Sequence, residues 1–401
     1  MNVIVLGAGV VGVSTAYYLA QRGCCVTVVE RADDVASATS HANGGQLSYS
    51  FTESLATPGF ITKIPALLLG RDIGTRIRLS PQLTRWGTRF LTQCTPKRSR
   101  ANSLALLETA MRSQQLMAEL RQTISFDFAF RPAGKLVLLA TDDELRIAES
   151  STALKRKHGS DVELLTESEA TLVEPALATF DAPIKAAVYS RSDEVGDARQ
   201  FVVGMRKHLE RQQDVKFHLG MSANKLIIES GRICGVHCRE SISADAVVVC
   251  LGIWSNDLLR DVGVDPHIYP VRGYSVTLPI STASPAVSIT ALRERFVFSR
   301  LNDKIRIAGF ADFKGFDNRA DDDRVRTLVD TARRVAPNAA DYDCVRQHPW
   351  GGFRPMTPNG RPCVGRTKVE GLYLNTGHGM LGWTLACATG KATADAVARA
   401  H

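Results

Sequence analysis

Three glycines near the start of the chain have the spacing of a phosphate-binding turn. Gly7, Gly9 and Gly12 form a G-x-G-x-x-G pattern, and Glu30 follows eighteen residues after the last glycine. The first glycine of such a pattern makes a tight turn, the second lets the backbone approach a pyrophosphate, and the third lets a helix pack closely. An acidic residue placed like Glu30 accepts hydrogen bonds from a ribose. The spacing predicts a dinucleotide site, either FAD or NAD, and a purely structural turn is the alternative.

The residues around this turn have the pattern of a strand, a helix and a second strand. Residues 3–6 are apolar and end at a glycine, which is typical of a buried parallel strand. Small and apolar residues with helical spacing follow, Gly23 stands where a helix would end, and 26–29 is another apolar run. The unit would present the helix N-terminus, with its unpaired N–H groups, to phosphates.

Two later segments also join an apolar strand to glycine. Residues 245–252 form a continuous apolar run after Asp245 and end at Gly252, which is typical of a central parallel strand whose carboxyl end meets a ligand. Residues 372–375 read as a strand and lead into a glycine-rich turn at 376–384, followed by a helix of small residues. This second turn would place another positive helix end against a ligand.

Two polar segments carry further side chains suited to binding. Residues 36–46 contain two consecutive glycines and no Lys, Asp or Glu, a composition that suits backbone lying close to a ligand. Residues 350–360 are rich in glycine and proline, so we expect a rigid loop that displays one arginine, Arg354.

Residues 61–100 carry as much net charge as the whole chain. They contain nine Lys and Arg against Asp72 alone, and large apolar residues lie between them. Such a stretch suggests contact with an anionic membrane surface. The alternative is a pair of helices packed on the body with a solvated basic face. Nucleic acid is not expected, because no motif or aromatic platform accompanies the charge.

The composition is that of an ordinary globular enzyme, with 44% hydrophobic and 22% charged residues. No run of about 18 apolar residues lacks charges, so we expect no transmembrane helix. The glycine motif starts at residue 7, so we expect no targeting peptide before it. The nine cysteines are scattered and have no zinc-site spacing, so we expect reduced thiols and no metal. A cytoplasmic protein follows, with 61–100 as the candidate for peripheral contact with the inner face of the cell membrane.

The remaining pattern predicts an α/β fold with two kinds of sheet. Helices are expected at 102–122, 142–157 and 197–212, and strands at 126–130, 134–139 and 215–219. Residues 265–312 alternate apolar and polar side chains, as antiparallel strands do. We therefore predict a discontinuous Rossmann-like cofactor domain (1–55, 190–262 and 345–401) and a substrate-binding domain with a mixed or antiparallel sheet (56–189 and 263–344).

Together these segments resemble the FAD-dependent D-amino acid dehydrogenase (small subunit) family of the D-amino-acid oxidase superfamily. The resemblance covers nearly the whole chain. It rests on five segments in the family's order, namely VLGAGVVGV at 5–13, TSHANGGQ at 39–46, RGYS at 272–275, RPMTPNG at 354–360 and LNTGHGMLGWT at 374–384.

The resemblance implies non-covalent FAD, held by segments near both ends of the chain. NAD is disfavoured, since NAD enzymes seldom bring a terminal glycine turn back to the same cofactor. The implied cofactor-binding residues are Gly7, Gly9, Val10, Val11, Gly12, Glu30, Arg31, Thr39, Ser40, Asn43, Gly44, Gln46, Leu47, Ala223, Cys250, Leu251, Gly252, Trp254, Gly377, His378, Gly379, Met380, Leu381, Gly382, Trp383 and Thr384.

The resemblance also implies oxidation of a D-amino acid to a 2-oxo acid and ammonia, by hydride transfer from Cα to the flavin. Arg354 matches the family's carboxylate-binding arginine, and a guanidinium fork suits a carboxylate. Tyr274 would be a second carboxylate partner or a pocket wall. His378 is expected to contact the flavin and not to act as a base, while His41 and Tyr49 are weaker candidates for the pocket.

The electron acceptor and the substrate leave alternatives open. The basic and apolar segment 61–100 favours a quinone or another acceptor that is not oxygen. An oxygen-using oxidase of the glycine or sarcosine type and an L-proline or hydroxyproline dehydrogenase are alternatives within the same fold. A flavin-holding subunit that turns over no substrate is the alternative of another class.

Overall fold

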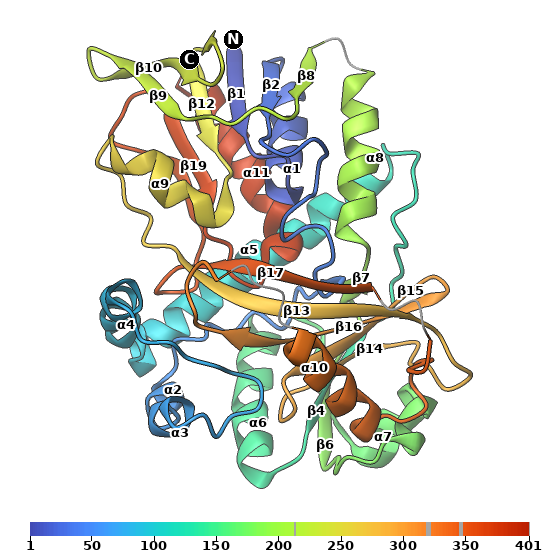
Figure 1. Ribbon diagram of the computed structural model, residues 1–401. Helices are drawn as coiled ribbons and strands as arrows, with labels where there is room; N and C mark the ends of the chain where they lie inside the picture. Colours follow the sequence, from blue (N-terminus) through green and yellow to red (C-terminus); the bar gives the residue numbers. More distant parts are fainter. Residues whose placement is uncertain (212–213, 318–321, 345–347, 401) are drawn as a thin grey trace.

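The computed structural model describes residues 1–211, 214–317, 322–344 and 348–400. Two large sheets organise the molecule, one in the upper and one in the lower half of Figure 1. The α/β fold predicted from the sequence is confirmed. No helix in the described ranges is both long and apolar enough to cross a membrane.

The six-stranded sheet is mostly parallel and carries the first glycine turn. Its strands lie in the order β18 (Cys363–Arg366), β19 (Leu372–Thr376), β12 (Ala246–Val249), β1 (Asn2–Leu6), β2 (Cys25–Val29) and β8 (Val215–His218). β1 pairs in parallel with β12 on one side and β2 on the other. The chain order thus reverses at β1, and ligands of such sheets bind at the carboxyl ends of the strands at that point.

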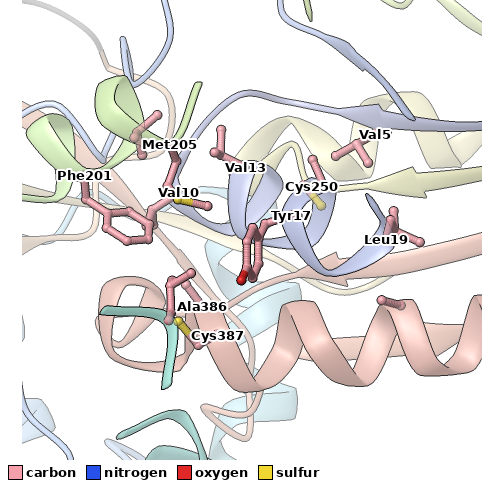
Figure 2. Close-up of a cluster of buried hydrophobic side chains, with 14 of the residues drawn as sticks. Val5, Val10, Val13, Tyr17, Leu19, Phe201, Met205, Cys250, Ala386 and Cys387 are labelled. Atoms are coloured by element: carbon pink, nitrogen blue, oxygen red, sulfur yellow. The ribbon is translucent and has the colours of Figure 1, made fainter. Parts of the chain in front are cut away.

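Four helices on one side of this sheet make the largest core. They are α1 (Val10–Ala20), α5 (Pro96–Arg121), α8 (Ala198–Glu210) and α11 (Gly382–Ala398). Figure 2 shows this core, with Tyr17 of α1 above Cys387 of α11 and with Phe201 of α8 in the same cluster. α1 and α11 approach closely, because a Cβ on Gly390 would lie 3.1 Å from the backbone nitrogen of Thr15.

The eight-stranded sheet is mixed. Its strands lie in the order β17 (His348–Met356), β13 (Tyr269–Pro279), β16 (Lys304–Asp312), β15 (Phe296–Leu301), β14 (Ser288–Ala291), β4 (Lys135–Leu139), β6 (Ala186–Ser190) and β5 (Val162–Thr166). Only the β14–β4 pair is parallel. The antiparallel character predicted for 265–312 is confirmed by the pairs of β13, β15 and β16.

The other elements are small sheets and peripheral helices. β9 (Lys225–Glu229), β10 (Arg232–His237) and β11 (Ser241–Ser243) form a three-stranded sheet, and β3 (Gln46–Leu47) pairs with β7 (Glu194–Val195). The helices are α2 (Pro58–Ile61), α3 (Ile64–Leu68), α4 (Pro81–Gln93), α6 (Asp142–Lys157), α7 (Glu167–Val173), α9 (Ser255–Arg260) and α10 (Asp322–Val335), with 3-10 turns η1 (Pro175–Thr179) and η2 (Gly252–Trp254).

Three local predictions were wrong. Residues 126–130 form no strand, because Ala129 adopts a left-handed φ of 54° that interrupts an extended chain. The helix expected from 102 begins at Pro96, where the Thr95 side chain accepts from the backbone N–H of Arg98. The segment 350–360 is mainly a strand and not a loop, since β17 runs to Met356 along β13.

The domain boundaries stay a prediction. Within the segment 345–401, β17 belongs to the eight-stranded sheet, whereas β18, β19 and α11 lie with the six-stranded sheet.

Candidate functional site

A cavity of about 1390 Å³ is lined by residues of both large sheets and of the loops that join them. It is larger than a typical small-molecule pocket of about 300–1,000 Å³. Its walls include the residues that directly follow β1 and β12, the N-terminus of α11, and one face of the eight-stranded sheet.

The first glycine turn has no room for side chains. Gly7 has a φ of 101°, and a Cβ there would lie 2.8 Å from the carbonyl oxygen of Cys250. A Cβ on Gly12 would lie 1.8 Å from the Gly7 oxygen, so this glycine fixes the turn although it does not line the cavity. The Glu30 carboxylate accepts from the backbone N–H groups of Ala8 (2.8 Å) and Ala32 (3.0 Å). The turn therefore keeps a bare backbone surface beside a fixed carboxylate, as a dinucleotide requires.

The segment 36–47 is anchored at both sides of the cavity. The Ser40 hydroxyl accepts from the N–H of Val10, the first residue of α1, at 3.0 Å. Thr39 donates to the Phe353 carbonyl at 2.6 Å, and the Ser275 hydroxyl donates to the Ala42 carbonyl at 2.6 Å. These bonds tie the segment to the glycine turn and to the eight-stranded sheet.

The second glycine turn is bound to the strand that carries Arg354. The N–H of Gly379 donates to the Pro355 carbonyl at 2.9 Å, and the backbones of Met356 and His378 pair as an isolated antiparallel β-bridge. Gly377 has a φ of 78°, and a Cβ there would lie 2.7 Å from the Thr357 side chain. Residues 378–384 thus reach the cavity at the start of α11, a helix with no acidic residue in its first turn.

His378 is buried and neutral. Burial lowers its pKa to about 3. Its Nε2 lies 3.0 Å from the hydroxyl of Thr389, which donates its own proton to the Leu385 carbonyl at 3.1 Å. The histidine must therefore donate from Nε2, which leaves Nδ1 as the unprotonated nitrogen. A neutral, hydrogen-bonded imidazole fits a residue that contacts the cofactor better than a general acid.

Arg354 is a cation held in place without a carboxylate. Its Nη1 donates to the Phe310 carbonyl at 2.6 Å, and Nη2 lies 3.5 Å from the Gly309 carbonyl. The guanidinium lies over Gly273, where a Cβ would come within 2.6 Å of Nη2. Within the described ranges, no carboxylate oxygen lies within 4.0 Å of it. Burial lowers the pKa of Arg354 to about 10, so it remains charged at neutral pH.

Tyr274 lies beside Arg354 in a second polar cluster. Its hydroxyl donates to Asp312 at 3.0 Å, and the other oxygen of Asp312 accepts from Arg324 at 2.8 Å. Asp312 and Arg324 are both buried. Tyr274 lines the cavity and is fixed by the carboxylate behind it.

Nearly all of the predicted site residues meet in this one cavity. Of the predicted set, Gly12, Leu47 and Gly377 do not line it, and Leu47 is packed in the core of the six-stranded sheet. Arg31 and Trp254 both line it and stack on each other, with the guanidinium carbon 3.6 Å from the ring centroid. The weaker candidates His41 and Tyr49 do not line it; the Tyr49 hydroxyl instead donates to Glu194 at 3.0 Å.

The sequence reasoning missed a polar end of the cavity. Lys135, Glu53 and Lys155 line it around the ring of Phe51, and Lys155 pairs with Glu53. Lys135 is 2% exposed. Nothing in the local pattern marks this lysine, because its neighbours in the cavity come from distant segments of the chain.

Comparison with known proteins bears on the cofactor and the chemistry. The family described as FAD dependent oxidoreductase (DAO) matches residues 2–396. The chain belongs to this family. Its cofactor is therefore FAD, and it is an oxidoreductase. The bare glycine turn, the fixed Glu30 carboxylate and the volume of the cavity all fit that cofactor.

Curated relatives cover the chain almost completely. It is 40% identical to D-amino acid dehydrogenase 2 of Ralstonia nicotianae, over 100% of this chain and 97% of the relative. It is 37% identical to D-amino acid dehydrogenase of Vibrio cholerae, over 98% and 94% of the two chains. It is 36% identical to the enzyme of that name from Dechloromonas aromatica, over 99% and 97%.

Solved structures share the fold at lower identity. Glycine oxidase from Geobacillus kaustophilus superposes with a TM-score of 0.78 at 22% identity, covering 99% of this chain and 94% of that one. L-proline dehydrogenase from P. horikoshii has a TM-score of 0.76 at 19% identity, covering 98% and 92%. These likenesses concern the fold alone, and they come from proteins named for the two alternative activities.

Proposed function

We propose that this protein oxidises D-amino acids to 2-oxo acids and ammonia, and that Arg354 binds the substrate carboxylate. One observation carries the proposal. Arg354 is a charged guanidinium that faces the cavity, and two backbone carbonyls orient it without neutralising it. Such a fork binds both oxygens of a carboxylate.

The surrounding residues support this assignment by fixing the site. Gly273 leaves room for the guanidinium, and Tyr274 stands beside it with its hydroxyl held by Asp312. FAD supplies the two-electron acceptor when it is bound. Orientation of the substrate by Arg354 is the contribution of the chain, because a fixed carboxylate limits how Cα can approach the acceptor. The relatives named D-amino acid dehydrogenase support the choice of substrate.

The substrate class is tested by anaerobic reduction of the purified yellow protein. Bleaching of the flavin absorbance by D-alanine, but not by L-alanine, is the expected result. Bleaching only by glycine, L-proline or hydroxyproline would replace the proposed substrate with one of the alternatives. A flavin that no amino acid bleaches would indicate a flavin-holding subunit.

We further propose that a membrane quinone accepts the electrons. The short helices α2 and α3 border the cavity through Phe60, Lys63 and Leu67. The same helices and the turn after them expose Ile61, Leu68 and Leu69, with Leu69 at 66% exposure, among basic residues of segment 61–100. An apolar edge with basic residues suits an anionic membrane surface, and here it lies at the rim of the cavity.

Sedimentation with vesicles tests the membrane contact. Wild-type protein should co-sediment with anionic vesicles and less with neutral ones, and Leu68→Ser with Leu69→Ser should weaken both. Leu172→Ser is the matched control, because Leu172 is 83% exposed on α7, outside both the segment and the lining of the cavity. An equal loss of vesicle binding in the control variant, or no vesicle binding by the wild-type protein, would refute the membrane contact. Rapid peroxide release in air, without reduction of a soluble quinone, would refute the quinone and favour an oxidase.

A further inference from the structure

Lys135 is a buried cation in the cavity wall to which the proposed reaction gives no role. It is the first residue of β4, and its Nζ donates to the Ser48 hydroxyl at 2.7 Å and to the Gln46 side-chain carbonyl at 3.1 Å. Nζ also lies 4.4 Å from the centroid of the Phe51 ring. In the part of the chain that the structure describes, no carboxylate oxygen lies within 4.0 Å of it. Its charge therefore acts in the cavity without a direct counter-ion.

This charge lies next to the positive end of α11. The residue that Lys135 contacts, Ser48, donates its backbone N–H to the Thr384 hydroxyl at 3.1 Å. Thr384 is in the first turn of α11, a helix of seventeen residues that begins at Gly382. A helix N-terminus behaves as about half a positive charge. The ammonium group of Lys135 and the N-terminus of α11 thus both make the electrostatic potential positive at one side of the cavity.

Two acidic side chains, Asp193 and Glu53, act on Lys135 without a direct ion pair. Glu53 is paired with Lys155. Asp193 is buried, and desolvation raises its pKa to about 6; one of its oxygens accepts from the N–H of Ser50 at 3.0 Å. Burial lowers the pKa of Lys135 to about 8, and the charges of Asp193 and Glu53 oppose that change. At neutral pH the lysine is therefore predominantly protonated.

We propose that Lys135 stabilises the reduced, anionic flavin and so raises the midpoint potential of the bound cofactor. The inference rests only on the FAD part of the proposed function and not on the choice of substrate. Two unit charges about 10 Å apart at an effective dielectric constant of about 20 change an equilibrium more than tenfold. A tenfold change in a two-electron equilibrium corresponds to about 30 mV. Lys135 acts through its field and through the side chains of Gln46 and Ser48, so it is a positioning residue.

The first test compares neutral and charged replacements by reductive titration of the holoenzyme against redox dyes. Lys135→Gln, which keeps a hydrogen-bond donor, should lower the midpoint potential by about 30 mV or more. Lys135→Arg keeps the charge and should remain close to wild type. Sulfite, which adds to electron-poor flavins, should bind at least tenfold more weakly to Lys135→Gln. Equal potentials in Lys135→Gln and wild type, or equal shifts in both variants, would refute the proposal.

The second test uses the unaltered protein and does not depend on a variant that folds. Reduction of flavin to its anion takes up one proton, so the potential should fall by about 30 mV per pH unit. Above about pH 8 the oxidised protein has a deprotonated Lys135, so reduction should take up a second proton and the slope should approach twice that value. Burial also raises the pKa of two neighbouring carboxyl groups, to about 6 for Asp193 and about 7 for Glu194, so both titrate below the step expected above pH 8. A constant slope between pH 6.5 and 9.5 would overturn the proposal, whether or not D-amino acids are substrates.

Discussion

Replacement of Arg354 by alanine tests the central assignment. Two hydrogen bonds from a charged donor to a carboxylate contribute about 1.5–3 kcal/mol each. Their combined loss, about 3–6 kcal/mol, corresponds to a fall in kcat/KM of about 100-fold to about 20,000-fold, because each 1.36 kcal/mol is a factor of ten. Arg354→Lys keeps the charge but not the planar fork, so its loss should be intermediate.

The assay is anaerobic flavin reduction by D-alanine in rapid mixing, over a range of substrate concentrations. The fall in kcat/KM should appear mainly as a higher D-alanine concentration needed for half-maximal reduction rate. The flavin absorbance should still correspond to one bound cofactor per chain. Arg361→Ala is the matched control, because Arg361 is exposed and seven residues away in the same segment.

A second readout separates carboxylate binding from general damage. Wild-type protein should prefer D-alanine strongly over ethylamine, which lacks only the carboxylate. In Arg354→Ala that preference should largely disappear. Kinetics within about threefold of wild type, or an unchanged preference for the acid over the amine, would contradict the reasoning.

Three further variants test other parts of the site. Gly12→Ala should yield protein without bound flavin, because its Cβ would lie 1.8 Å from a backbone oxygen; Gly87→Ala, whose Cβ would meet nothing within 4 Å, should keep its colour. Tyr274→Phe removes the 3.0 Å bond to Asp312 and should lower the free energy of unfolding by about 1–3 kcal/mol, measured by denaturant titration, with a smaller effect on KM than Arg354→Ala. Burial holds the pKa of His378 at about 3, so the unfolded chain binds the proton first and stability falls as the pH drops below about 6.5. His378→Gln should remove a slope of up to about 1.4 kcal/mol per pH unit between pH 6 and 4, and an identical pH dependence in both proteins would contradict this protonation state.

Local signals made much of the fold and site predictable. The glycine turn at 7–12 and the start of the helix at residue 197 follow from residue types and short spacings. In the structure Asp197 caps α8 by accepting from the N–H groups of Arg199 and Gln200. The segment at 126–130 was misjudged because its aromatic residues look like a strand. Phe126 and Phe128 instead pack against Phe201 of α8. Aromatic content alone does not separate a strand from a loop whose side chains fill a core.

The missed features depend on contacts between distant segments. Lys135 looked like an ordinary residue at the start of a strand, and only its contacts with residues some ninety positions earlier make it a buried cation at the cavity. The role of Asp312 likewise could not be predicted from the residues around it in the sequence. Its hydrogen-bond donors come from three other segments: the side chains of Tyr274 and Arg324 and the backbone N–H of Arg76. Spacing along the chain carries no information about such a convergence.

The Asp312 cluster explains why Arg354 can keep its charge for a ligand. Asp312 is close enough to raise the pKa of Arg354, so it is the natural counter-ion of that guanidinium. However, one of its oxygens already accepts from Arg324 and the other from Tyr274. Arg354 is instead oriented by the carbonyls of Phe310 and Gly309, which fix its direction without forming an ion pair. Because both oxygens of Asp312 already accept hydrogen bonds from other side chains, a substrate carboxylate that enters the cavity does not have to compete with Asp312 for Arg354.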